Sequence, residues 1–285
     1  MTFVPTAEIS EVAALPNHPI ILRSHRPALA CETLRDLLAA TGFPVLSGYH
    51  EGEICEYADL NSEEMLEAFE SGRLTLNMAN STIAKTSDPD ERLTIPAQID
   101  DCNLFNFHDA TLRLRKCLVI SQGGSYTRLH VDAWGMAGWM YLYHGRKRWH
   151  LWEPVFVPLL YDQINERYYD EDAGHAHPDP RCRALIEALP RWEGEIGPGE
   201  LLWFPEGWAH RVWTTEDAFG FGGASLHYGR LDQALRSWLW EKRLGFADVF
   251  DYLDLLRDAA AHGFDTAPFI QRVQDTLALW LRNRE

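Results

Sequence analysis

Short apolar and aromatic runs, separated by Gly, Pro and Asp, follow one another from about residue 112 to residue 230. The separating residues are those that most often form turns, and strands at this spacing are typical of a β-sandwich or a β-barrel. Between Pro154 and Arg191 the pattern is interrupted, because Asp, Glu, His and Pro become frequent. We interpret residues of about 155–191 as a polar insertion between two halves of the β-structure. The runs are LRKCLVIS, RLHVDAW, GWMYLYHG, KRWHLWEP, GELLWFP, AHRVWT and AFGFGGASLHY.

Helical patterns flank this β-rich stretch on both sides. Residues 31–41 carry leucines at helical spacing, residues 61–71 open with a capping-box-like segment, and each stretch stops at a glycine. The predicted fold is mainly β with flanking helices: an N-terminal α/β region over 1–110, a β core over 111–230 and a C-terminal helical region over 231–285. The apolar faces of the last helices either pack on their own domain or form a homodimer interface.

The size and charge of the chain limit what it can bind. With 285 residues and 46% hydrophobic content, it can bury a sizeable core, in one large domain or in one domain plus appendages. The formal net charge is −16, with 26 Lys+Arg against 42 Asp+Glu. Because phosphate binding needs a basic face, a nucleic-acid partner is disfavoured, although a local basic patch stays open.

The cysteines and the apolar stretches indicate in which cellular compartment the protein is expected. The five cysteines are scattered and form no C-x-x-C pair, which argues against a disulfide framework or a zinc knuckle and fits a reducing compartment. The first residues, MTFVPTAEIS, lack a basic segment followed by an apolar run, and no stretch approaches the ~18 consecutive apolar residues of a membrane span. We therefore expect a cytoplasmic protein without a membrane partner.

The segment SYTRLHVDAWG (residues 125–135) places two polar side chains on one face of an apolar strand. Residues two apart on a strand point the same way, so His130 and Asp132 project together. Burying an ionised carboxylate costs several kcal/mol unless it is paired or binds a cation. Imidazole plus carboxylate is the beginning of a 2-His-1-carboxylate metal site. A second H-x-D, His177-Pro-Asp179, is polar and proline-flanked, and we interpret it as a solvated loop.

A second histidine for such a site is His210, in GPGELLWFPEGWAHRVW (residues 197–213). It opens a strand after the turn Pro205-Glu-Gly207, and it completes a triad if the β-structure folds back on itself. The alternative is a core histidine hydrogen-bonded to a backbone carbonyl.

Two blocks of sequence extend this pattern. The first is Thr127-x-x-His130-x-Asp132 with Gly145-Arg-Lys147-Arg-Trp149 and Pro154, and the second runs from Gly199-Glu200 to Pro205-x-Gly-Trp208-x-His210. Together they resemble the Jumonji-C (JmjC), cupin-like Fe(II) and 2-oxoglutarate dioxygenases, in the hydroxylase-like branch, over about residues 110–230. HPIILRSHRP (18–27) is similar to the family's first segment. The resemblance implies a double-stranded β-helix, a form of the jelly roll. It also implies His130, Asp132 and His210 as the iron ligands.

The resemblance further implies 2-oxoglutarate as cosubstrate. The far carboxylate of this dianion needs a cation and a hydroxyl inside the barrel. We expect Lys147 to supply the cation, and Thr127 matches the family's hydroxyl donor. The alternative for Lys147 is an ordinary exposed lysine in a basic turn beside Arg146 and Arg148.

The chain departs from the family pattern around the cosubstrate. Met136 and Met140 stand on the strand where some relatives carry an asparagine, and no tyrosine stands near residues 70–80. Asn77 and Asn80 are candidate substitutes for that tyrosine. The family's last cosubstrate residue falls at Ala224-Ser225, which makes Ser225 a candidate.

The predicted function is an Fe(II)/2-oxoglutarate-dependent dioxygenase that hydroxylates a C–H bond of an amino-acid side chain and releases succinate and CO2. Its substrate is a peptide, a protein or a small molecule. The segments PEGWAH and GRKRWHLWEP look like the hydroxylase branch, and the length leaves no room for the reader domains that often accompany histone demethylases. The alternatives are a non-catalytic metal-binding cupin module and an RNA-modifying oxygenase, the latter disfavoured by the acidic charge.

Overall fold

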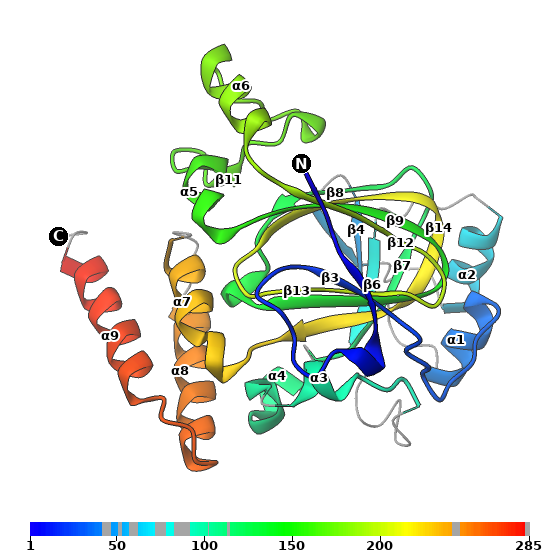
Figure 1. Ribbon diagram of the computed structural model, residues 1–285, viewed down its shortest axis with the longest axis horizontal. Coiled ribbons are helices and arrows are strands. Elements are labelled where there is room, and N and C mark those ends of the chain that lie inside the picture. The colour runs from blue at the N-terminus through cyan, green and yellow to red at the C-terminus, as the bar shows by residue number, and fades with distance from the viewer. Residues whose placement is uncertain are drawn as a thin grey trace.

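The fold is known from a computed structural model, which describes residues 1–41, 47–50, 53–56, 62–71, 78–82, 92–101, 103–112, 115–240 and 246–282. A curled, mixed β-structure forms its centre, and helices lie around it (Figure 1). The strands are β1 (Thr2–Phe3), β2 (Thr6–Glu8), β3 (Ile20–Arg23), β4 (Ser47–His50), β5 (Glu53–Glu56), β6 (Met78–Thr82), β7 (Cys117–Ser121), β8 (Tyr126–His130), β9 (Ala137–Trp152), β10 (Tyr161–Asp162), β11 (Arg167–Tyr168), β12 (Trp192–Ile196), β13 (Leu201–Phe204) and β14 (Ala209–Ser225).

Two long antiparallel strands, β9 and β14, build both halves of the β-structure. They pair from Ala209↔Trp152 at one end to Ser225↔Ala137 at the other. The first half of β9 has β13 on its other side and the second half has β12, while β14 pairs with β8 and then with β7. Each long strand therefore belongs to two facing sheets. This arrangement confirms the predicted mainly β, jelly-roll core with flanking helices.

The long strands turn from one sheet into the other near the middle of their length. The register of β14 against β9 shifts there, between Thr214 and Gly220. On β9 the turn falls at Gly145, whose φ is 80°, and a Cβ at this position would lie 2.1 Å from the backbone oxygen of Asp217. Only glycine fits such a close approach, so this residue allows the two sheets to face each other.

The N-terminal segments extend one of the sheets. Its order is β2-β3-β13-β9-β14-β7-β6-β4-β5, while β12 and β1 follow the other half of β9. Two predicted helices are confirmed here as α1 and α2. The helices are α1 (Leu34–Thr41), α2 (Ser62–Glu70), α3 (Ala97–Asp100), α4 (Asp109–Leu112), α5 (Val157–Leu160), α6 (Pro180–Ala188), α7 (Leu231–Trp240), α8 (Phe246–Ala261) and α9 (Ala267–Arg282).

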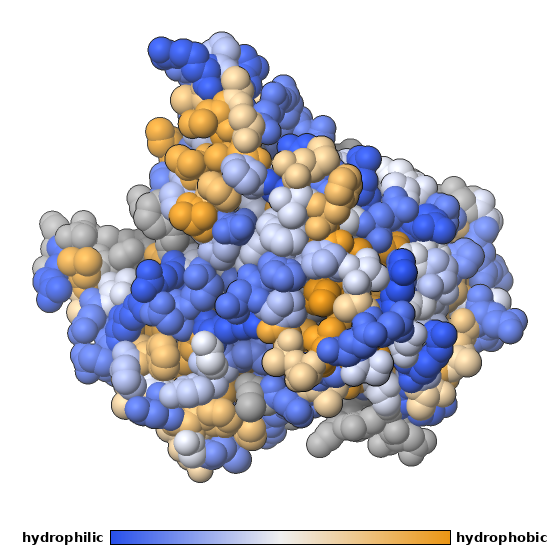
Figure 2. Space-filling model, in the orientation of Figure 1, coloured by the Kyte–Doolittle hydropathy of each residue, from blue (hydrophilic) through white to orange (hydrophobic). Residues whose placement is uncertain are grey.

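The residues between β9 and β12 project from the barrel and contain α5, the β10–β11 hairpin and α6 (Figure 1). We call this segment, residues 153–191, the insertion. Figure 2 shows apolar surface on this projection, where Val155, Leu159 and Leu185 are exposed. Asp179 of the second H-x-D accepts a hydrogen bond from the Arg181 N–H and so caps α6. This motif has a structural use at a helix end.

The C-terminal helices cover one flank of the barrel. Trp238 of α7 stacks on Tyr252 of α8, and both join a buried cluster with Phe105 and Trp134 of the core. The apolar faces of α7 and α8 are therefore packed on their own domain, while Phe250 and Leu279 stay exposed. Pairing of two copies through these helices stays a prediction. None of the helices in the described ranges is long and apolar enough to cross a membrane.

Candidate metal centre and cosubstrate pocket

A cavity of about 290 Å³ lies between the two sheets. Side chains from β7, β8, β9, β13 and β14 reach it, so it occupies the inside of the jelly roll. Its lining consists of Cys117, Val119, Thr127, His130, Asp132, Met136, Gly138, Trp139, Met140, Lys147, Trp149, Phe204, His210, Val212, Gly222, Gly223 and Ala224.

Three of these residues form a compact cluster of metal-ligand type. His130 of β8 and His210 of β14 are direct cross-strand partners, and their ring centroids lie 4.2 Å apart. Oδ1 of Asp132 lies 3.3 Å from Nε2 of His130 and 3.8 Å from Nε2 of His210. Ligand atoms of all three lie within 4.8 Å of one another, and the described residues hold no other such group of His, Cys, Asp or Glu. The β-structure thus folds back on itself, which is the condition under which His210 completes the triad.

The second nitrogen of each imidazole is fixed by the backbone. Nδ1 of His130 lies 2.7 Å from the carbonyl oxygen of Arg128, and Nδ1 of His210 lies 3.3 Å from that of Trp208. A carbonyl accepts only from a protonated nitrogen, so these contacts place a proton on each Nδ1 and orient both Nε2 atoms toward Asp132. The carbonyl contact expected for a plain core histidine is therefore present at His210, but it serves to aim the ring.

The charges in the cluster favour a bound cation. Burial, and then the neighbouring His130, lower the pKa of His210 to about 4, so this ring is neutral at pH 7. Burial alone would raise the pKa of Asp132, but His210 and His130 hold it below its ordinary value. Asp132 begins the short 3₁₀ turn Ala133–Gly135 without capping it by its side chain. One carboxylate and two imidazoles, with His210 neutral, fit a divalent transition metal with open positions.

Lys147 is the second notable group in the cavity. The lysine is buried, with 1% of its surface exposed, while Arg146 and Arg148 on either side point outward. Its Nζ donates to Oγ of Ser121 at 2.6 Å and lies 3.3 Å from Oγ1 of Thr214. Burial lowers the pKa of Lys147 to about 7. The alternative of an exposed basic turn is wrong, because β9 runs unbroken through this segment and its alternation turns Lys147 inward.

The polar group around Lys147 has the composition of an anion site. Among the described residues that line the cavity, the acidic one is Asp132 of the metal cluster. The ammonium of Lys147 contacts hydroxyl groups instead. A buried ammonium without a carboxylate is costly unless an anion binds. The far carboxylate of 2-oxoglutarate fits this requirement. Ser121 and Thr214 were missed in the sequence, although Thr214 is the cross-strand partner of Lys147 and becomes evident once that register is known.

The remaining candidates differ in position. Thr127 lines the cavity together with Met136 and Met140. Ser225 is buried opposite Ala137 at the end of β14, where the preceding Ala224 lines the cavity and Ser225 does not. Asn77 lies outside the described residues. Asn80 lies in β6, where its backbone pairs with Val119 of β7, and its side chain lies outside the description. The structure therefore brings Thr127 and Lys147 to the metal cluster, but not Ser225.

The chain is similar to a known protein family and to several known proteins. The family model of the cupin-like domain matches residues 55–229. The chain is 24% identical over 188 residues to lysine-specific demethylase 7A of Mus musculus, covering 59% of this chain and 19% of the relative. It is 28% identical over 140 residues to histone lysine demethylase PHF8 of Danio rerio, covering 49% and 13%.

A third relative is the JmjC domain-containing histone demethylation protein 1 of Caenorhabditis elegans, 25% identical over 150 residues, covering 53% of this chain and 13% of the relative. The chain thus spans less than a fifth of the length of each of these three relatives.

Proposed function

Because the chain belongs to the cupin-like domain family, we propose that it is an Fe(II)- and 2-oxoglutarate-dependent oxygenase that hydroxylates a C–H bond of an amino-acid side chain. The observation that carries this proposal is one cavity that holds both a His-Asp-His cluster and a buried lysine without an acidic partner in the described residues. A metal-binding module needs only the first of these features. An oxygenase that consumes an organic dianion needs both.

His130, Asp132 and His210 would hold the iron, and Lys147 with its surrounding hydroxyls would bind the far carboxylate of 2-oxoglutarate. When bound, the iron supplies the redox chemistry by which O2 and 2-oxoglutarate become succinate and CO2, while the substrate C–H gains one oxygen atom. The backbone carbonyls behind the two imidazoles keep Nε2 aimed at the metal position. Lys147 would position the cosubstrate by a charge-assisted hydrogen bond.

The other lining residues are mostly apolar and would exclude water from the site of reaction. Trp149 and Phe204 pack beside the ring of His210, with centroids 5.7 Å and 4.4 Å away, and Met136, Trp139 and Met140 add further apolar surface. Such walls exclude water and strengthen the electrostatic contacts inside the site.

The charges of the lining favour a neutral target. Among the described residues, the charged groups of the lining belong to the triad and to Lys147, each of which would have a role toward iron or cosubstrate. A methylated lysine would bring a further cation beside Lys147 with no spare carboxylate. The proposed product is therefore a hydroxylated, uncharged side chain in a peptide, protein or small molecule. The relatives named as demethylases make loss of a methyl group the competing outcome.

The test uses the full chain with Fe(II), 2-oxoglutarate and air, first without and then with a panel of peptides and amino acids. Succinate release should depend on His210, so His210→Ala should abolish it, and a substrate should gain the mass of one oxygen. No succinate with any substrate would favour the non-catalytic metal-binding module. Formaldehyde together with loss of a methyl group would replace hydroxylation by demethylation as the product.

A further inference from the structure

Between Thr127 and His130, strand β8 contains one more residue than the matching stretch of β14. His210 pairs with His130 and Val212 pairs with Thr127, so two steps along β14 match three steps along β8. On a regular strand, residues three apart face opposite sides. Thr127 and His130 nevertheless both line the cavity. The extra residue, a β-bulge, is what puts the hydroxyl and the metal ligand on one face.

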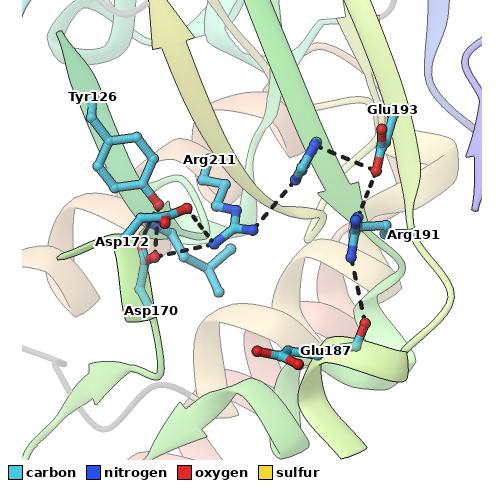
Figure 3. Close-up of polar contacts among 9 residues, drawn as sticks. Tyr126, Asp170, Asp172, Glu187, Arg191, Glu193 and Arg211 are labelled. Atoms are coloured by element: carbon cyan, nitrogen blue, oxygen red, sulfur yellow. Dashed lines mark hydrogen bonds and ion pairs between the residues drawn. The ribbon is translucent and has the colours of Figure 1, made fainter. Parts of the chain in front are cut away.

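Asp170, in the insertion just after β11, holds this bulge from outside the barrel (Figure 3). Its Oδ2 accepts a hydrogen bond from the backbone N–H of Leu129 at 2.7 Å, inside the irregular stretch. Both carboxylate oxygens also accept from the hydroxyl of Tyr126, at 2.6 and 2.7 Å. In the described residues β8 has β14 as its strand neighbour, so Asp170 supplies contacts that a second strand would otherwise make.

Arg211 connects the same carboxylate to the strand of the other histidine. Its Nη1 lies 3.3 Å from Asp170 and 3.2 Å from Asp172, and its guanidinium lies over the ring of Trp213, 4.8 Å from the centroid. Asp170 is 3% exposed, so its charge depends on these partners. The residues it holds are the immediate neighbours of Thr127, His130 and His210.

We propose that Asp170 is a positioning residue, which fixes the bulge of β8 and thereby keeps His130 and Thr127 turned toward the cavity. The proposal rests on the proposed function in that His130 is taken as a metal ligand. A carboxylate that merely anchored the insertion would affect stability, but it would leave the affinity for a metal unchanged in the folded protein.

The experiment compares Asp170→Ala and Asp170→Asn with the matched control Asp172→Asn in the full chain. Asp172 also contacts Arg211, but it is about half exposed and no contact with β8 is found for it. Mn(II) affinity is measured by calorimetry well below each variant's unfolding temperature, and amide exchange is followed at Leu129 and His130. Loss of a group that orients a ligand typically costs about 10- to 100-fold in metal affinity. We expect that loss for Asp170→Ala, faster exchange at both amides, and less than a twofold change for the control.

Asp170→Asn retains one oxygen for the Leu129 N–H and should weaken Mn(II) binding less than the alanine variant. If Asp170→Ala fails to fold, the asparagine variant decides. Wild-type Mn(II) affinity and wild-type exchange at Leu129 in a folded variant would overturn the proposal. His130→Ala in the same assay separates the two hypotheses, because retention of Mn(II) binding there would contradict the metal assignment and not the role of Asp170.

Discussion

Two imidazoles and one carboxylate meet on the inner wall of the jelly roll, and a lysine is buried in the same cavity. Each of these side chains is held by contacts of its own, His130 and His210 through backbone carbonyls and Lys147 through hydroxyls. None of these contacts neutralises the carboxylate or the ammonium. Bound ligands of opposite charge would do both, and the single-residue predictions follow from that.

Removing one metal ligand should abolish metal binding. His130→Ala and Asp132→Ala each leave two ligands of three, and chelation by two side chains is too weak to retain a divalent ion at micromolar concentration. We expect loss of Fe(II) or Mn(II) binding and of 2-oxoglutarate turnover, measured by calorimetry and by succinate release. His177→Ala, in the second H-x-D, is the control and should behave as wild type. Equal loss in the control would contradict the assignment.

Lys147→Ala should weaken 2-oxoglutarate binding and leave metal binding intact. A buried charge-assisted hydrogen bond contributes about 1.5–3 kcal/mol, which corresponds to a rise in Kd of roughly one to two decades. The measurement is a titration of 2-oxoglutarate into the Mn(II)-loaded protein. An unchanged Kd would show that Lys147 does not contact the cosubstrate.

The pH dependence of that affinity follows from the lowered pKa of Lys147. The free amine titrates at about 7, and a bound carboxylate raises its pKa, so binding takes up a proton above pH 7. Affinity should be constant below pH 7 and should then fall by up to about tenfold per pH unit as the pH rises toward the pKa of the complex. Lys147→Met should bind weakly with a flat profile between pH 7 and 9. A flat profile in the wild type would contradict a charged Lys147 in the complex.

At the level of strands and helices, alternation predicted part of the site from sequence. It predicted that His130 and Asp132 project together, and they do meet, although β8 ends at His130 and Asp132 begins a 3₁₀ turn beyond the strand. Alternation also turns Lys147 inward once β9 is known to be continuous. It could not place Thr127 beside His130, because their spacing is that of opposite faces and the bulge depends on Asp170, which is distant in sequence. The interior position of Ala224 rather than Ser225 likewise depends on register. What sequence pattern predicts is local periodicity, and what it misses is set by contacts between distant segments.

The turn after Asp132 contacts the turn at residues 205–207 on one side and the C-terminal helices α7 and α8 on the other. Gly135 has a φ of 63°, its carbonyl accepts from the Gly207 N–H at 3.0 Å, and a Cβ there would lie 2.3 Å from the backbone oxygen of Ala234 in α7. Trp134, with φ 60°, packs edge-on against Tyr252 of α8. The C-terminal helices therefore support the turn that presents Asp132. Sequence periodicity predicted these helices but gave no sign of this contact.

Gly135→Ala should consequently destabilise the protein and disturb the metal site. Gly124→Ala is the matched control, because Gly124 has a φ of 85° and nothing within 4 Å of its would-be Cβ. Both variants carry the left-handed backbone cost of about 1–2 kcal/mol. The clash with α7 should add about 1–3 kcal/mol to the loss in free energy of unfolding for Gly135→Ala alone. Denaturant unfolding and Mn(II) titration measure the two effects, and equal values for the two variants would contradict the role of α7.

Across the whole molecule, the charge is strongly acidic, and two basic side chains beside the insertion, Arg191 and Arg211, are paired with acids. Arg191 lies 2.7 Å from Glu193 and hydrogen-bonds the backbone oxygen of Glu187, while Arg211 lies between Asp170 and Asp172 (Figure 3). An acidic surface attracts basic segments and repels polyanions over about a Debye length. These features favour a neutral or basic substrate segment over a nucleic acid.

We therefore expect no RNA binding by the full chain. Non-specific binding of nucleic acid comes from cations that displace counterions from phosphates, and proteins that use it reach a Kd of about 10⁻⁴–10⁻⁶ M at physiological salt. With 42 Asp+Glu against 26 Lys+Arg, the protein lacks the excess cations for such a surface. Fluorescence anisotropy with a labelled single-stranded RNA should show no saturation up to about 100 µM protein at 50 mM salt, where phosphate contacts are strongest. Saturable binding that weakens steeply as salt is added would reveal a local basic patch and would move the RNA-modifying oxygenase ahead of the amino-acid hydroxylase.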